Sequence, residues 1–184
     1  MNVTLPPDPW QKIKTLHDLP ADEVISALQK EIRRGNTENA CRLAYEMIQT
    51  SPEMEEKLWI RLVVISVEDV GMGNPQAPVL INTLYELHNR FSIGALDRPL
   101  FAIHAVRYLC ECEKDRSSDE LLNWIKQTEQ VPEIPDYAID MHTKRGHEKG
   151  RGLKHFYEEA SKVAPELKNR NTDYLKKIFH LLGF

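Results

Sequence analysis

The chain has 184 residues, of which 41% are hydrophobic and 28% are charged, and its formal net charge is -4 at neutral pH. These values are typical of a globular domain with a sizeable core. The negative charge argues against a protein that coats nucleic acid over its whole surface, but it leaves room for a local basic face. No apolar run approaches the roughly 20 residues that span a bilayer. Residues 1–9 have neither the basic start nor the apolar core of a secretion signal. We therefore expect a cytoplasmic protein with no membrane partner.

Helical patterns follow one another through most of the chain. Apolar residues at three- and four-residue spacing predict helices near 10–16, 22–35, 37–50, from 51–52 onward, 75–91, 99–113 and 118–128. Gly35 is typical of a helix C-terminus, and Thr37 and Ser51 are typical of N-caps. Alternation typical of strands is nearly absent. We predict an all-α fold, a compact bundle or array of about eight to nine helices.

A rigid segment divides the chain near residue 131. Pro132 and Pro135 each bias the preceding residue away from helical geometry. We predict an N-terminal arm at residues 1–20, a helical core at 21–131 and a C-terminal extension at 132–184 that packs on the same domain. The last helix has an apolar stripe formed by Leu175, Ile178, Phe179 and Leu182. We expect this stripe to pack in the core, and a surface for a partner helix is the alternative.

An acidic pair lies one turn before the expected end of a buried helix. Glu68 and Asp69 are followed by Gly71, Gly73 and Pro75, which is expected near the first turn of the next helix. Carboxylates at a helix C-terminus face the negative end of the helix dipole, which is unfavourable unless they bind something. We expect the pair to accept hydrogen bonds from the backbone N–H groups at the next helix start. A ligand-binding or catalytic role for the pair is the alternative.

The same segment carries a resemblance to a known family. Its sequence, Ser66-Val-Glu-Asp-Val-Gly-Met-Gly-Asn-Pro-Gln-Ala77, resembles the "SEDIGLADPQA" segment in the C-terminal domain of the replication-associated recombination ATPases. This is the bacterial RarA/MgsA family, whose eukaryotic relatives include the Werner-helicase-interacting protein. The resemblance covers residues 22–131 and includes the segments 25–35, 40–47 and 98–109. The family's tail, rich in Gly, Tyr and Pro, is replaced here by residues 141–152 and a further helical region.

The resemblance implies a domain that takes part in tetramer formation and in work at replication forks. Family members are AAA+ ATPases whose nucleotide chemistry lies in a preceding domain. No Gly-x-x-x-x-Gly-Lys-Ser/Thr loop, the cradle for ATP phosphates, occurs in this sequence. We therefore expect a non-enzymatic module without a cofactor. Its expected partners are further copies of itself, a tetramer being favoured, or a separate AAA+ ATPase.

A basic segment between residues 141 and 155 is the second candidate site. Its basic side chains are interleaved with three glycines and face a single acid, Glu148. The candidate phosphate-binding residues are Lys144, Arg145, His147, Lys149, Arg151 and Lys154. Because glycine lets backbone N–H groups approach a phosphate closely, the segment suits weak binding of single-stranded or forked DNA. The alternative is a solvated basic loop that pairs with acids elsewhere on the chain.

Two hypotheses of a different class arise from the same residues. Several side chains in the last quarter could converge on a metal ion: Asp140, His142, His147 and His155 with Glu158 or Glu159. Their spacing matches no compact metal signature, so we predict no metal site. The chain could also be a small phosphate-binding protein or metal-dependent enzyme in which Glu68 and Asp69 act with the 140–155 segment in one pocket. No motif in the sequence fixes a nucleophile for that chemistry.

Overall fold

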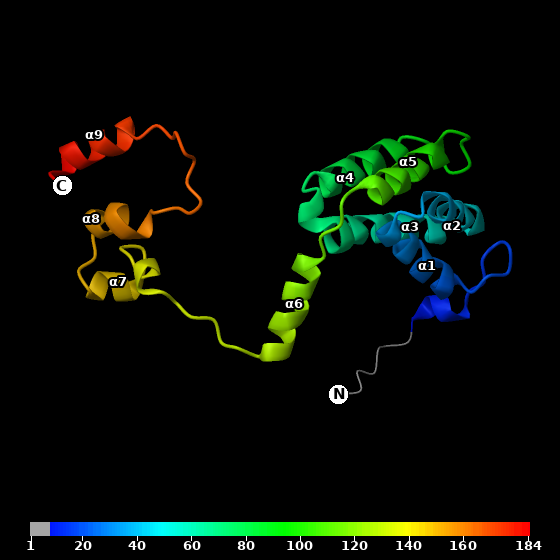
Figure 1. Cartoon of the computed structure of the whole chain (residues 1–184), viewed down its shortest axis with the longest axis horizontal. Helices are drawn as coiled ribbons and strands as arrows, with labels where there is room; N and C mark the ends of the chain where they lie inside the picture. Colours follow the sequence, from blue (N-terminus) through cyan, green and yellow to red (C-terminus); the bar gives the residue numbers. More distant parts are fainter. Residues whose placement is uncertain (1–7) are drawn as a thin grey trace. The chain divides into compact units, whose positions relative to one another are not determined.

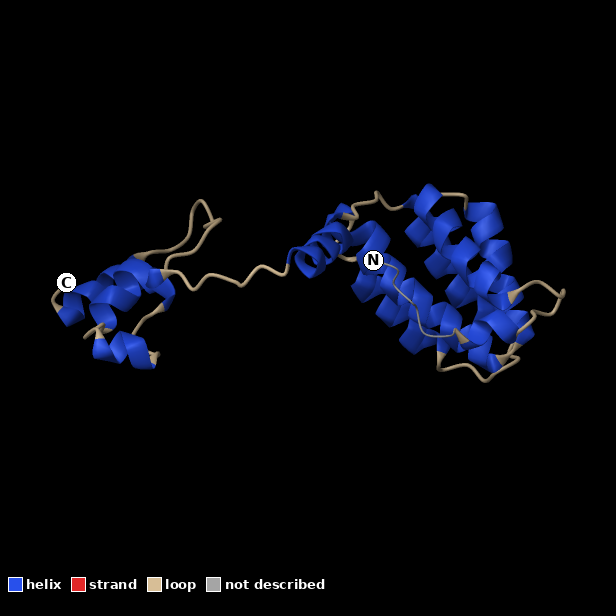
Figure 2. Cartoon of the chain, turned by 90° about the horizontal axis from the view of Figure 1, so that it is seen from below, coloured by secondary structure: helices blue, strands red, loops and turns tan. Residues whose placement is uncertain are grey.

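The computed structural model describes residues 8–184, in which nine α-helices are joined by loops and short helical turns (Figure 1). Within this range the chain forms no strand (Figure 2), apart from one isolated bridge between Lys14 and Pro20. The prediction of an all-α fold is confirmed. Residues 1–7 of the predicted N-terminal arm lie outside the described residues. The chain divides into two units, the first ending at Glu129 and the second beginning at Gln130.

Six α-helices belong to the first unit: α1 (Ala21–Arg34), α2 (Thr37–Thr50), α3 (Pro52–Ile65), α4 (Ala77–His88), α5 (Arg98–Glu111) and α6 (Ser117–Thr128). A short 3-10 turn, η1 (Pro9–Lys12), precedes them. The first five helices bury one apolar core between their inward faces (Figure 1). Its largest fully buried side chains include Leu28, Ile32, Met47, Leu58, Trp59, Leu62 and Leu109. No helix in the part that the structure describes is long and apolar enough to cross a membrane.

Local end signals explain most helix boundaries in the first unit. Gly35 ends α1 in the left-handed conformation with φ of 72°, as predicted. Ser51 caps α3, because its hydroxyl oxygen accepts a hydrogen bond from the backbone N–H of Met54 at 3.2 Å. The prediction for Thr37 was wrong. It is the first residue of α2 and not its cap, and its hydroxyl donates to the carbonyl of Gly35.

The start of α4 differs from the predicted helix at 75–91. Pro75 lies in a turn before α4 and not in its first turn, and the helix ends at His88. The carbonyl of Asn74 accepts a hydrogen bond from the backbone N–H of Ala77 at 3.0 Å. This bond closes a turn around Pro75, so helical geometry begins only at Ala77.

The second unit, residues 130–184, contains α7 (Lys144–Glu148), α8 (Leu153–His155) and α9 (Asp173–Leu182). Only Ile139 and Gly146 are buried in it. The ring of Phe179 in α9 lies 6.1 Å from the ring of Tyr157 and 6.1 Å from that of Phe184. Aromatic contacts within the unit therefore cover part of the predicted α9 stripe. The prediction that residues 132–184 pack on the helical core stays a prediction.

Candidate functional site

The acidic pair lies in a π-helical turn that continues α3. This turn, η2 (Ser66–Val70), follows the last α-helical residue, Ile65. In a π-turn the hydrogen bonds span five residues, so the helix widens and its side chains point in new directions. Asp69 is fully buried there, while the side chain of Glu68 is 27% exposed. The pair thus faces the interior of the first unit.

Three side chains from distant positions hold Asp69. Its Oδ1 accepts hydrogen bonds from Arg33 Nε and Arg116 Nη1, both at 2.5 Å, and its Oδ2 accepts one from Gln29 Nε2 at 2.9 Å. Glu68 Oε1 lies 3.3 Å from a guanidinium nitrogen of Arg33 and of Arg116, and 2.8 Å from Gln29 Nε2. We name these five residues the carboxylate cluster. It ties α1 and the start of α6 to the end of α3.

The prediction of which groups bind the acidic pair was wrong. The carboxylate oxygens of Glu68 and Asp69 accept hydrogen bonds from side chains, not from the backbone N–H groups that begin α4. The physical reason is the π-turn, which directs both carboxylates towards α1 and the residue before α6. A buried carboxylate is tolerated only when it is paired and hydrogen-bonded, and both oxygens of Asp69 meet that condition. The contacts of the pair therefore lie within the first unit.

Two glycines let the chain after the acidic pair pass close to the segment before α6. Gly71 has φ of 51°, and a Cβ placed on it would lie 2.3 Å from the carbonyl oxygen of Asp115. A Cβ on Gly73 would lie 2.6 Å from the carbonyl oxygen of Glu113. In the other direction, the backbone N–H of Asp115 donates to the carbonyl of Asp69 at 3.0 Å. The Glu-Asp-aliphatic-Gly motif thus has a packing explanation.

The carboxylate cluster should make stability depend on acid pH. Burial alone would raise the pKa of Asp69, but its hydrogen bonds to Arg33, Gln29 and Arg116 outweigh burial and hold that pKa below its ordinary value of 3.8. The stabilisation is therefore complete above the unfolded pKa and is lost as pH falls through the folded pKa. We expect the difference in unfolding free energy between the wild type and Asp69→Asn to shrink below about pH 4. Urea unfolding across this range measures it, and a pH-independent difference would contradict the assignment.

The cluster also bears on the catalytic hypothesis for the pair. A general base needs a carboxylate oxygen within hydrogen-bond reach of a substrate proton. Asp69 is 0% exposed and both of its oxygens have partners, and Glu68 is paired with two arginines. The geometry therefore favours the structural role of the pair over catalysis.

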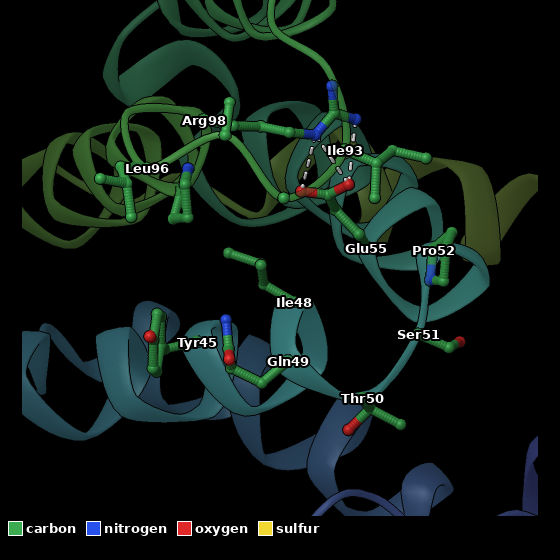
Figure 3. Close-up of a pocket in the computed structure, with 13 residues that line it drawn as sticks. Tyr45, Ile48, Gln49, Thr50, Ser51, Pro52, Glu55, Ile93, Leu96 and Arg98 are labelled. Atoms are coloured by element: carbon green, nitrogen blue, oxygen red, sulfur yellow. Dashed lines mark hydrogen bonds and ion pairs between the residues drawn. The ribbon is translucent and has the colours of Figure 1, made fainter.

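A second buried ion pair, which sequence reasoning missed, lies beside a cavity of about 490 Å³ between the end of α2 and the loop from α4 to α5 (Figure 3). The carboxylate of Glu55 accepts hydrogen bonds from Arg98 Nε at 3.0 Å and lies 2.9 Å from Arg98 Nη2. The Nε2 atom of His88 lies 3.6 Å from Oε1 of Glu55, and burial lowers the pKa of His88. Arg98 also donates to the carbonyl of Phe91, which holds the loop. The one available signal was an acid, Glu55, on the apolar face of α3.

The predicted basic loop contains a short helix. Thr143 caps α7, because its Oγ1 accepts a hydrogen bond from the backbone N–H of Gly146 at 3.0 Å. The N–H of Gly150 donates to the carbonyl of His147 at 2.9 Å. These two N–H groups are used within the segment, so the expectation that they would bind phosphate was wrong.

Two of the six candidate basic residues anchor the segment. Lys149 Nζ lies 2.8 Å from Asp136 Oδ1, and Arg151 pairs with the same carboxylate and donates to the carbonyl of Ile139 at 2.6 Å. Hydrogen bonds from Lys149 and Arg151 lower the pKa of Asp136 to about 2. The side chain of Arg151 is only 16% exposed. For these two residues the alternative of a self-paired basic segment holds.

The other four candidates, Lys144, Arg145, His147 and Lys154, are exposed. Lys144 lies 3.9 Å from Glu148 and Lys154 lies 4.0 Å from Glu158, which are weak surface ion pairs. Arg145 forms no ion pair within residues 8–184. These four side chains remain able to reach a ligand.

The histidines of this quarter do not gather around one point. Asp140 and His142 contact each other, with 3.0 Å between Oδ2 and Nδ1. Across residues 8–184 no group of three or more His, Cys, Asp or Glu side chains is placed to hold a metal ion. The structure therefore does not assemble the set considered from the sequence.

The observations define an all-α domain in which the acidic motif accepts hydrogen bonds from side chains of α1 and from Arg116. Residues 36–179 match the family described as "MgsA AAA+ ATPase C terminal", and the chain belongs to this family. The match extends past residue 131, so the expectation that the C-terminal region departs from the family was wrong. The matched family part is a C-terminal one, and the sequence contains no P-loop motif.

Two bacterial relatives have the same printed name, "Replication-associated recombination protein A". The chain is 30% identical over 155 residues to the protein from Bacillus subtilis (strain 168), covering 80% of this chain and 35% of the relative. It is 29% identical over 122 residues to the protein from Haemophilus influenzae (strain ATCC 51907 / DSM 11121 / KW20 / Rd), covering 66% of this chain and 26% of the relative. The chain thus spans about a third or less of these relatives, in a family associated with replication and recombination.

Proposed function

We propose that this chain is a non-enzymatic association module of a replication- or recombination-associated system, and that it forms homo-oligomers through α6. The printed name of the two bacterial relatives supports the setting, and a cytoplasmic location belongs to the same proposal. A tetramer, or a complex with a partner AAA+ ATPase, would be the larger assembly. The single observation that carries the proposal is the exposed apolar face of α6.

None of the twelve residues of α6 is buried. The start of α6 is tied to its own unit, because Arg116, the residue before the helix, pairs with Asp69 of the carboxylate cluster and with Asp119 of α6, both at 2.5 Å. Four large apolar side chains are half exposed or more: Leu121, Leu122, Trp124 and Ile125. Amphipathic helices bury such a face, and a contiguous exposed apolar patch marks an interaction surface. A second copy of the same helix is the occupant that a self-associating module requires.

Light scattering after size-exclusion chromatography tests the association. We expect the wild-type chain at tens of micromolar to have a mass well above its monomer mass of 21.3 kDa. The double variant Trp124→Glu with Ile125→Glu should shift it towards the monomer, because burying two unpaired carboxylates in an interface costs several kcal/mol. Leu96→Glu is the matched control, since Leu96 is a 96% exposed residue in the loop before α5. A monomeric wild type, or a double variant that still associates, would contradict the proposal.

A second proposed activity is weak binding of single-stranded or forked DNA by the second unit. Residues 130–184 contain ten Lys and Arg against eight Asp and Glu, whereas residues 1–129 contain fourteen against twenty. The positive charge that nucleic acid requires is therefore concentrated in the second unit. The exposed side chains of Lys144, Arg145, His147 and Lys154 supply the contacts, while Lys149 and Arg151 hold the segment in shape.

Salt dependence is the measurable signature of this binding. If about three to five phosphates are neutralised, the slope of log K against log salt should be roughly -2 to -4 for single strands. Replacing Lys144, Arg145 and Lys154 together by Ala should make that slope shallower by about 2 and weaken all sequences alike. Fluorescence anisotropy with labelled oligonucleotides measures both effects.

The choice of variant follows from the ion pairs. Changing Arg151 would remove the anchor to Asp136, so a loss of binding could reflect lost structure. A triple variant of exposed lysines in the first unit and outside α6, Lys12, Lys14 and Lys30, removes the same charge from elsewhere. Equal losses in the two triple variants, or no binding at low salt, would rule out the segment as the site.

A further inference from the structure

α9 presents two chemically different faces. Its inner side chains, Leu175, Ile178 and Phe179, are half-buried within the second unit. The outer face displays Tyr174, Lys176, Lys177, His180 and Leu181, and Tyr174 is 71% exposed. Residues three apart share a helix face, so Tyr174 and Lys177 are neighbours, and Lys176 lies on the other side of Lys177. The only acid of the helix, Asp173, is its first residue, where the helix dipole stabilises a negative charge.

Within residues 8–184, Lys176 and Lys177 of α9 have no carboxylate within ion-pair distance. Among the ten Lys and Arg of residues 130–184, six lie within ion-pair distance of a carboxylate. Four do not within the described residues: Arg145, Lys168, Lys176 and Lys177. Two adjacent unpaired lysines repel each other, and this repulsion is relieved when an anion binds. α9 therefore presents the unneutralised charge that a phosphate backbone would neutralise.

The outer face has a defined shape. Lys176, Lys177, His180 and Leu181 line a surface hollow of about 410 Å³. The Nζ atom of Lys177 lies 5.2 Å from the centroid of the Tyr174 ring. Cation and aromatic ring are thus held beside each other on one surface, within reach of the phosphate and the base of a single nucleotide.

The basic segment approaches the C-terminal end of α9. Lys154 Nζ lies 5.9 Å from the centroid of the Phe184 ring, and that ring lies 6.1 Å from the ring of Phe179 on the inner side of the helix. The exposed cations of α7 and α8 and those of α9 belong to the same unit.

We propose that the outer face of α9 is a binding surface for single-stranded nucleic acid, in which Tyr174 stacks on a base while Lys176 and Lys177 contact phosphates. Every base has a π-face, so stacking on Tyr174 binds without sequence preference. Stacking requires an unpaired base, so the surface selects single strands over duplex. This inference rests on the proposed nucleic-acid binding of the second unit and names the strand type and the residues that choose it.

The test uses the full chain and a labelled oligothymidylate of about 20 nucleotides. Tyr174→Leu keeps an apolar side chain and removes the ring, so the dissociation constant for the single strand should rise about five-fold or more. Tyr174→Trp should restore or tighten binding. Lys176→Ala with Lys177→Ala should reduce the magnitude of the salt slope by about 1.4, because two phosphate contacts are lost. On irradiation, an oligonucleotide that carries 5-iodouracil should crosslink to the peptide that contains Tyr174.

Each possible result decides one claim. The α9 surface would be overturned if both α9 variants bound with the affinity and salt slope of the wild type. If the Lys144, Arg145 and Lys154 triple variant lost binding in the same experiment, the basic segment would be left as the site. Equal loss of single-strand and duplex affinity in Tyr174→Leu would overturn strand selection by stacking. No binding of the wild type at low salt would overturn the proposed nucleic-acid binding itself. Far-ultraviolet circular dichroism is the check that Tyr174→Leu remains folded.

Discussion

Asp69→Asn should lower the free energy of unfolding by roughly 2–4 kcal/mol. The change leaves two guanidinium groups, of Arg33 and Arg116, beside a neutral amide, and the amide NH₂ would face cationic or amide donors. Breaking a fully buried pair costs about 3–5 kcal/mol, and the 29% exposure of both arginine side chains lets water recover part of that loss. Urea unfolding followed by tryptophan fluorescence measures the change, because Trp59 is buried in the same unit.

Glu68→Gln is the matched control for this prediction. Glu68 is the neighbouring carboxylate with the same arginine partners, but its side chain is 27% exposed and its guanidinium contacts are longer, at 3.3 Å. Its removal should cost less than about 1 kcal/mol. Equal effects of the two substitutions would show that burial of Asp69 does not set the strength of the cluster.

Gly71→Ala should destabilise the first unit by about 3 kcal/mol or more. Two effects add: an L side chain is strained at φ of 51°, and the new Cβ would lie 2.3 Å from the carbonyl oxygen of Asp115. The backbone of Asp115 cannot retreat without loss of its hydrogen bonds to the carbonyls of Asp69 and Val70, at 3.0 and 3.1 Å. Thermal and urea unfolding report the loss.

Gly94→Ala separates the two effects. Gly94 also has positive φ, at 83°, but nothing lies within 4 Å of a Cβ placed there. Backbone strain alone should cost about 1–2 kcal/mol. If Gly71→Ala cost no more than Gly94→Ala, the close approach of the segment before α6 would not explain the glycine in the motif.

The helices of the first unit could be predicted from the sequence because their apolar spacing agrees with signals at their ends. Leu28 and Ile32 lie on the predicted inner face of α1, and Gly35 ends that helix. Local signals failed where a tertiary or turn contact decided the boundary. The hydroxyl of Thr37 donates to a carbonyl and does not cap, and the turn at Asn74 delays α4.

The partners of the acidic pair could not be predicted in the same way. The helix dipole indicated correctly that Glu68 and Asp69 must contact another element. It could not indicate which one, because Arg33 and Arg116 are 36 and 47 residues from Asp69 along the chain. An arginine on a helix face is equally compatible with solvent, so only the tertiary arrangement distinguishes these two from the exposed arginines.

The basic segment shows the same limit. Composition located the positive charge correctly in the last quarter of the chain, but it could not separate anchors from free cations. Lys149 and Arg151 are fixed by Asp136, which lies 13 and 15 residues upstream, across a turn and a helix that sequence reasoning had read as a loop. The lack of carboxylate partners for Lys176 and Lys177 in α9 likewise appears only in the tertiary structure of the described residues.

Amide chemical-shift mapping by NMR tests most directly the claim that the acidic motif holds the fold while the second unit contacts the ligand. The isotope-labelled chain would be titrated with a short single-stranded oligonucleotide at low salt. We expect shifts at residues 144–154 and in α9, with Tyr174 and Lys177 among the largest, and no shift in η2 or at Gly71. Shifts concentrated at Glu68, Asp69 and their arginine partners, with the second unit unchanged, would contradict this division of roles.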